Sequence, residues 1–189
     1  MRPFAHSARG ISSGLVMRLL SPVCRSVSLV ISLALLLAWP LGAESATREL
    51  AGQISRVVDG DTLWFRPDDP AEPLVAVRLR GIDAPESCQV WGWQATAALR
   101  EQFQGRPATL RLHGQDDYRR TLGTLRVAGQ DVNGALVEQG HAWAWRDAHG
   151  RSPYLQQEAS ARARHEGLHA DPAAETPWDF RQRHGRCRH

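Results

Sequence analysis

The chain has 189 residues, which is enough for one domain with a hydrophobic core but scarcely for two. Its formal net charge of +3 reflects 23 basic residues, all arginine, against 20 acidic ones. Four of the 23 arginines precede Ala43, so 19 face 20 acidic residues from Glu44 onward, and overall basicity gives no argument for nucleic-acid binding.

The N-terminal segment has the order of a secretory signal peptide. Arg18 and Arg25 precede an apolar run at residues 29–41, and the small-residue segment GAESA follows it. The run is shorter than the stretch of about 20 apolar residues that spans a bilayer. The sequence therefore predicts a signal peptide over residues 1–43, with Met17 as an alternative start, and export to the periplasm or the medium. An uncleaved membrane anchor is the alternative.

Alternation of apolar and polar residues between turn signals predicts five strands in the remainder of the chain. They are expected at residues 50–59, 62–67, 75–83, 108–114 and 122–129. The segment DGDT, residues 59–62, predicts a tight turn between the first two strands.

Helical spacing predicts one helix between the third and fourth strands and others after the fifth. In the first of them, residues 91–105, apolar side chains fall on one side. Those side chains are Ala95, Ala98, Leu99 and Phe103. Further helices are expected at residues 132–140 and from Ser152–Pro153 to Gly167.

This order of elements predicts a β-rich α+β fold, a five-stranded barrel of the oligonucleotide-binding (OB) type with an inserted helix and C-terminal helices. The domain is expected over residues 48–181, followed by a mobile basic tail over residues 182–189.

Three carboxylates occur where predicted strands begin or end. Asp61 lies at the first hairpin, and Asp83 and Glu86 follow the third strand. If these strands pair, the carboxylates converge on one rim of the barrel and require a cation between them. With no His or Cys close by in the sequence, the oxygen ligands favour Ca²⁺ or Mg²⁺ over Zn²⁺.

Arginines accompany these carboxylates. Arg78 and Arg80 share one strand face, and Arg119 and Arg120 occupy the loop between the last two strands. A guanidinium group is a planar fork that suits phosphate oxygens. The simpler alternative is that DGD is only a hairpin turn and DAPE only a strand exit.

Five segments together resemble the thermonucleases, the staphylococcal nuclease-like family, in order and spacing. They are DGDT at 59–62, RLRGIDAPE at 78–86, DDYRRTLG at 116–123, VNGALVEQGHAW at 132–143 and GLHADPAAETPWDFR at 167–181. The resemblance covers residues 50–181. It implies an OB-type barrel and a Ca²⁺-dependent nuclease, and nothing in the sequence demands more than a monomer. Such an enzyme hydrolyses DNA and RNA with little sequence specificity and leaves 3′-phosphate ends.

The resemblance also implies roles for individual residues. Asp61 and Asp83 match the metal-binding carboxylates, and the backbone carbonyl of Ala84 matches a third ligand. Glu86 matches the acid that positions or deprotonates the attacking water. Arg78 and Arg120 match the arginines that hold the scissile phosphate, and Tyr118 matches an aromatic residue beside the nucleotide.

Two positions depart from the family pattern. Arg119 stands where Gly is usual, which bears on the geometry of the loop. Arg146 stands near a position where an aromatic base-stacking residue is expected, so Trp143 or Trp145 could stack instead.

Other interpretations remain. A noncatalytic OB-type module that binds nucleic acid is the main alternative, because a fold does not determine a function. The segment HEGLH, residues 165–169, matches the zinc-peptidase pattern HExxH, but Gly167 interrupts the helix that this motif needs. Cys88 and Cys187 either form a disulfide or are free thiols.

Overall fold

The computed structural model describes residues 48–185 and Cys187. The predicted signal peptide lies outside these residues. No helix in the described part of the chain combines the length and the apolar character needed to cross a membrane.

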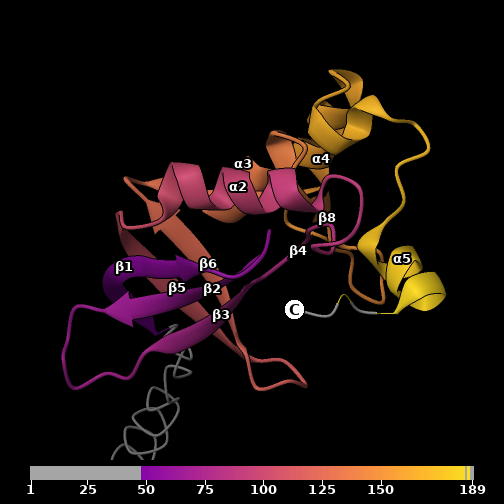
Figure 1. Ribbon diagram of the computed structural model, residues 1–189. Helices are drawn as coiled ribbons and strands as arrows, with labels where there is room; N and C mark the ends of the chain where they lie inside the picture. The colour runs from indigo at the N-terminus through magenta and orange to yellow at the C-terminus, as the bar shows by residue number, and fades with distance from the viewer. Residues whose placement is uncertain (1–47, 186, 188–189) are drawn as a thin grey trace, which may run out of the picture. The chain divides into compact units, whose positions relative to one another are not determined.

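Five strands form a closed barrel, which confirms the predicted architecture (Figure 1). They are β1 (Glu49–Val57), β2 (Thr62–Pro67), β3 (Val75–Leu79), β5 (Pro107–Gln115) and β6 (Thr121–Val127). The order is β3-β2-β1-β5-β6, with antiparallel neighbours throughout. A parallel pairing of β3 with β6 closes the barrel.

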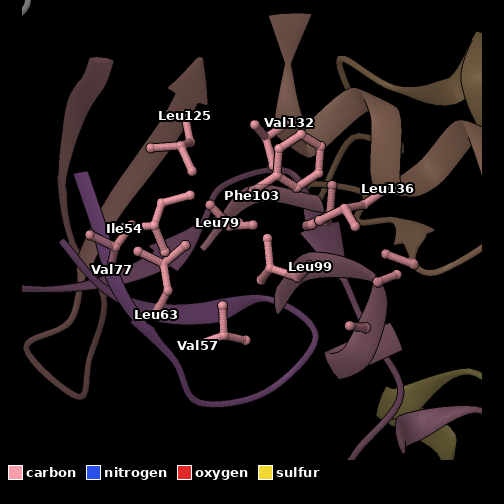
Figure 2. Close-up of a cluster of buried hydrophobic side chains, with 14 of the residues drawn as sticks. Ile54, Val57, Leu63, Val77, Leu79, Leu99, Phe103, Leu125, Val132 and Leu136 are labelled. Carbon is pink, nitrogen blue, oxygen red and sulfur yellow. The ribbon is translucent and has the colours of Figure 1, made fainter. Parts of the chain in front are cut away.

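Alternate residues of the strands fill the barrel interior, because successive side chains of a strand point to opposite faces. Figure 2 shows side chains from β1, β2, β3 and β6 converging on one cluster. The buried strand residues include Ile54, Val57, Leu63, Phe65, Val77, Leu79, Leu110 and Leu125. Each side chain of this size contributes about 1.5–3 kcal/mol when fully buried.

Two helices cover the barrel, and their apolar faces complete the same core (Figures 1 and 2). Helix α2 (Gly92–Phe103) buries the four side chains that the sequence placed on one face, from Ala95 to Phe103. Helix α3 (Val132–Glu138) contributes Val132 and Leu136.

A buried asparagine joins α3 to the strands that close the barrel. Asn133 Nδ2 donates to the carbonyl oxygens of Arg80 and Gly123 at 2.9 and 3.0 Å. Its Oδ1 accepts from the N–H of Leu125 at 3.1 Å. The buried Asn133 side chain thereby provides hydrogen-bond partners for main-chain groups of β6 and of the residue that follows β3.

The predicted third strand is divided by a turn. Gly81 has φ of +79°, and the chain continues as β4 (Ile82–Asp83) in a different sheet. Strand β4 pairs with β8 (Trp143–Ala144), and β7 (Gln130–Asp131) extends the edge beside β6. The prediction of one continuous strand to residue 83 is therefore wrong. The turn carries Asp83 away from the line of β3.

The C-terminal part also differs from the sequence prediction. Helix α4 (Leu155–Ala163) ends before Gly167, and a 3₁₀ helix, η1 (Gly167–Ala170), follows it. Gly167 packs so closely on Gly140 that a Cβ there would lie 2.3 Å from the Gly140 carbonyl oxygen. The chain must leave the helix to make this approach.

A last helix, α5 (Pro177–His184), occupies part of the segment predicted as a mobile tail. Residues 182–184 belong to this helix, so the prediction is wrong for them. The Thr176 hydroxyl caps the helix by accepting from the Asp179 N–H at 3.2 Å. Beyond the helix, Cys187 forms a disulfide with Cys88, which settles the open question of the two thiols.

Candidate active site

Asp61 lies in the turn between β1 and β2, where hydrogen bonds fix it. Its N–H donates to Asp59 Oδ1 at 3.0 Å, and its carbonyl oxygen accepts from the Leu79 N–H at 2.8 Å. Its carboxylate accepts from the Ala84 N–H at 2.7 Å and from the Thr62 hydroxyl at 3.1 Å. These contacts hold the carboxylate against the segment that follows β3.

Arg78 bridges two carboxylates beside the barrel wall. The register of β2 on β3 places Thr62 opposite Arg78, one residue from Asp61. Arg78 Nη1 forms an ion pair with Asp61, and Nη2 donates to Asp83 Oδ1 at 2.8 Å. The Arg78 side chain is only 15% exposed, so these charges interact with little screening by water.

Burial perturbs both aspartates. Loss of hydration raises the pKa of Asp61 from 3.8 to about 6, although the positive charge of Arg78 opposes this rise. Loss of hydration raises the pKa of Asp83 as well, again against Arg78. The site therefore holds two carboxylates whose lost hydration the neighbouring arginines only partly offset.

A hard cation fits this donor set. Ca²⁺ prefers carboxylate and carbonyl oxygens, and a cation between Asp61 and Asp83 would offset the hydration that both carboxylates have lost. The described residues contain no group of three or more His, Cys, Asp or Glu side chains arranged to hold a metal. A cation here would therefore need further ligands, such as a backbone carbonyl, water or substrate oxygens.

Arg120 reaches the site from the loop before β6. Its Nε donates to Asp116 Oδ2 at 2.8 Å, and its own N–H donates to Asp116 Oδ1 at 2.9 Å. The guanidinium lies over the ring of Tyr118, 5.6 Å from the ring centroid. Its Nη1 is 3.4 Å from the Thr62 hydroxyl, beside Asp61.

Arg119, the residue that departs from the family pattern, has φ of +63°. This left-handed conformation is the one that glycine adopts without strain. The loop therefore keeps a turn that suits glycine, and Arg119 adopts it at an energetic cost.

Glu86 lies in a tight turn between β4 and α2. The turn is held by Gln89, whose N–H donates to the Glu86 carbonyl oxygen at 2.8 Å and whose Oε1 accepts from the Glu86 N–H at 3.1 Å. A Cβ on Gly92 would lie 2.0 Å from that carbonyl oxygen, so the first residue of α2 must be glycine for this turn to close.

Arg181 was not predicted from the sequence as a site residue. From α5, its Nη1 donates to Glu86 Oε1 at 3.0 Å, and its Nη2 donates to Asp83 Oδ2 at 3.0 Å. Arg181 lies 95 residues from Glu86 in the sequence, so no local pattern joins them. Two signals were available: Arg181 closes the segment 167–181 that resembles the family, and a Cys88–Cys187 pairing would bring the two segments together.

One pocket of about 250 Å³ gathers the predicted charged residues. Tyr118 lies outside its lining, but it contacts Arg120, which belongs to it. The pocket thus combines acidic groups able to hold a cation or accept a proton with guanidinium groups able to bind an anion. The lining residues are Asp59, Asp61, Arg78, Asp83, Ala84, Pro85, Glu86, Arg120, Arg181 and Cys187.

The second departure from the family pattern lies outside this pocket. Arg146 forms an ion pair with Glu158 of α4 and donates to the Ala144 carbonyl oxygen at 3.0 Å. Trp143 is buried, with its ring edge-on to His169, so it does not offer a face for base stacking. Trp145 is exposed and lines a separate pocket beside Gly81.

The zinc-peptidase pattern HEGLH does not form a metal site. His165 has φ of +53°, beyond the end of α4, whereas His169 lies in η1. The two histidines therefore do not share one face of an α-helix, which the motif requires.

Comparisons with known proteins identify the family of the chain. The family model described as staphylococcal nuclease homologue matches residues 76–171. The chain is 39% identical over 152 residues to "Protein ParB" of Escherichia coli, a match that covers 74% of this chain and 84% of the relative. It is 33% identical over 128 residues to an "uncharacterized endonuclease" of Haemophilus influenzae, covering 67% and 71%. It is 32% identical over 149 residues to a "micrococcal nuclease" of Shigella flexneri, covering 72% and 83%.

Proposed function

Given that the chain belongs to the family of staphylococcal nuclease homologues, we propose that it is a Ca²⁺-dependent nuclease that cleaves DNA and RNA with little sequence specificity and leaves 3′-phosphate ends. That the chain is a phosphodiester-hydrolysing enzyme follows from the family itself. The metal, the substrates and the products are the proposal. The convergence of Asp61, Asp83, Glu86, Arg78 and Arg120 in one pocket is the observation that carries it.

The cation would be held by Asp61, Asp83 and the backbone carbonyl of Ala84. Two buried carboxylates with raised pKa values support this assignment, because a cation would offset the hydration that burial removes from them. Bound there, Ca²⁺ would supply positive charge for the phosphoryl oxygens and compensate the carboxylates that Arg78 compensates in this structure.

The protein's own side chains perform the remaining tasks. Arg78 and Arg120 bind the phosphoryl oxygens, on which negative charge accumulates as the P–O bond breaks. Glu86 orients the attacking water and accepts its proton. Tyr118, whose ring contacts Arg120, packs beside the nucleotide.

Low sequence specificity follows from the kind of contacts that the pocket offers. Its guanidinium groups bind phosphate, which every nucleotide carries, and Tyr118 offers a π face that accepts any base. One chain supplies every residue named here, so a monomer suffices. We also propose export to the periplasm or the medium, which the Cys88–Cys187 disulfide supports because disulfides persist in oxidising compartments.

The test is cleavage of single- and double-stranded DNA and of RNA by the purified protein, in Ca²⁺ or in a chelator, beside a Glu86→Ala variant. We expect Ca²⁺-dependent cleavage that collapses in the variant, and product ends that a 3′-phosphatase converts to 3′-hydroxyls. Binding of DNA without cleavage, by folded wild-type protein in Ca²⁺, would instead identify a noncatalytic binding module.

A further inference from the structure

Helix α5 contributes a third arginine to the pocket. Arg181 contacts both Asp83 and Glu86. Its Nη1 lies 3.0 Å from Glu86 Oε1 and 3.3 Å from Asp83 Oδ1, and its Nη2 lies 3.0 Å from Asp83 Oδ2. Charge-assisted hydrogen bonds of this kind also restrict orientation, because the guanidinium fork is rigid. One planar group thus fixes two carboxylates relative to each other.

Two tethers hold α5 against the turn that carries Glu86, one on each side of Arg181. Before the helix, Gln89 Nε2 donates to the Glu175 carbonyl oxygen at 2.7 Å. After the helix, Cys187 is bonded to Cys88. Both tethers end within three residues of Glu86, at positions 88 and 89. The relative position of Arg181 and Glu86 is therefore fixed from both ends of the helix.

The burial of these groups makes their contacts effective. The Arg181 side chain is 24% exposed, and those of Glu86 and Asp83 are 21% and 8% exposed. Charges in such surroundings interact more strongly than pairs on an open surface. By contrast, Arg183, two residues further along α5, is 63% exposed and pairs with Glu175.

We propose that Arg181 is a positioning residue of the nuclease, which orients Glu86 and Asp83 from a helix fastened by the Cys88–Cys187 disulfide. The inference rests on the proposed function, in which Glu86 orients the attacking water and accepts its proton. Arg181 closes the segment 167–181 that resembles the family, but that resemblance assigns it no role, and the family model matches only residues 76–171. The assignment therefore comes from its contacts in this structure.

The principal test compares Arg181→Ala with Arg183→Ala, a matched control on the same helix. Turnover and KM are measured on a defined DNA in saturating Ca²⁺, with circular dichroism as the check of folding. Misplacing a catalytic group costs about 10²-fold in rate, so we expect Arg181→Ala to lower kcat by about 10- to 100-fold with little change in KM. Arg183→Ala should keep the wild-type kcat.

Two further measurements separate positioning from a structural role. Added guanidinium ion should partly restore kcat to Arg181→Ala, because it can occupy the vacated place between the carboxylates. In a Glu86→Gln background, Arg181→Ala should lower kcat much less than it does in the wild type, because residues that act as a unit are not additive.

The disulfide provides an independent perturbation. Dithiothreitol reduces it by two electrons, giving thiols at Cys88 and Cys187 and one disulfide in the oxidised reductant. We expect kcat to fall after reduction, and also in a Cys88→Ser, Cys187→Ser double variant. Arg181→Ala should then have a smaller additional effect than in the bridged protein.

The outcomes distinguish this inference from the proposed function. If the wild-type protein cleaves DNA but folded Arg181→Ala retains its kcat, the inference is overturned and the proposed function stands. A lowered kcat that guanidinium does not restore, with an undiminished effect in the Glu86→Gln background, would assign Arg181 a structural role only. A wild-type protein without Ca²⁺-dependent cleavage would overturn both.

Discussion

Replacement of Asp61 by asparagine should stabilise the metal-free protein. Asparagine fits the hydrogen bonds of the site. Its amide oxygen can accept from the Ala84 N–H and from Arg78, which both meet Asp61 Oδ2. Its amide nitrogen can donate to the Thr62 hydroxyl, which now donates to Oδ1. The variant therefore removes the charge and keeps the contacts.

The magnitude follows from the raised pKa of Asp61. A folded-state pKa of about 6, against 3.8 in the unfolded chain, means that folding favours the protonated acid. The resulting stability is fully present below pH 3.8 and is lost as the pH rises through 6. At about 1.36 kcal/mol per unit of pKa difference, ionised Asp61 lowers the free energy of unfolding at pH 8 by at most about 3 kcal/mol. Asparagine carries no charge at either pH and avoids this loss.

The assay is urea unfolding of wild type and Asp61→Asn in a chelator, at pH 8 and pH 4. We expect the variant to be more stable by up to about 3 kcal/mol at pH 8, and by less than about 1 kcal/mol at pH 4. The control is Asp147→Asn, because hydrogen bonds from the Arg151 N–H lower the pKa of Asp147, and loss of its charge should bring no gain. Ca²⁺ should stabilise the wild type and not Asp61→Asn. Equal gains at both pH values, or destabilisation at pH 8, would refute the electrostatic argument.

Three other substitutions test separate parts of the molecule. Arg78→Lys should lower turnover in the DNA cleavage assay by about 10³-fold or more, since lysine lacks the planar fork that binds phosphate. Arg80→Lys is the control and should not lower it. Near-normal turnover of Arg78→Lys would contradict the phosphate-binding role of Arg78. Asn133→Ala should lower the free energy of unfolding by at least about 2 kcal/mol, because it leaves the buried Leu125 N–H without this partner and removes the hydrogen bond to the Arg80 carbonyl oxygen. A loss below about 1 kcal/mol in urea would count against this contribution. The Arg119→Gly variant should be more stable than Arg119→Ala by about 1 kcal/mol in thermal unfolding, because residue 119 has φ of +63°. Equal stabilities of the two variants would show that the turn relaxes.

The barrel was predictable because each strand shows an alternation of apolar and polar residues. Side chains such as Ile54, Leu63 and Val77 alternate with polar residues, and each buried set faces the same interior. Helix α2 was predictable for the same reason, at a period of 3.6 residues. The break at Gly81 was not, because the residues on both sides of it are equally suited to a strand, and only the pairing of β4 with β8 shows where the chain turns.

The C-terminal segment shows the limit of local patterns more clearly. Residues 181–189 are rich in Arg and His, a composition that is typical of a solvated tail. Helix α5 is amphipathic only weakly and buries little apolar surface, with Pro177 as its one buried residue. Polar contacts, the Arg181 ion pairs and a disulfide between residues 99 apart in the sequence hold this helix in place. None of these interactions produces a periodic pattern of apolar residues in the sequence.

The same contrast explains why five charged residues of the pocket could be proposed from the sequence and Arg181 could not. Asp61, Arg78 and Arg120 lie on or next to barrel strands that pair with one another, and Asp83 and Glu86 follow β3 closely in the chain. Their convergence is a consequence of the fold, so a sequence that predicts the fold also predicts the cluster. Arg181 belongs to α5, which lies outside the barrel, and its position beside Glu86 and Asp83 depends on the Cys88–Cys187 bond. If the proposed role of Arg181 is correct, activity depends on that bond as well as on the barrel, so the enzyme should work best where disulfides persist.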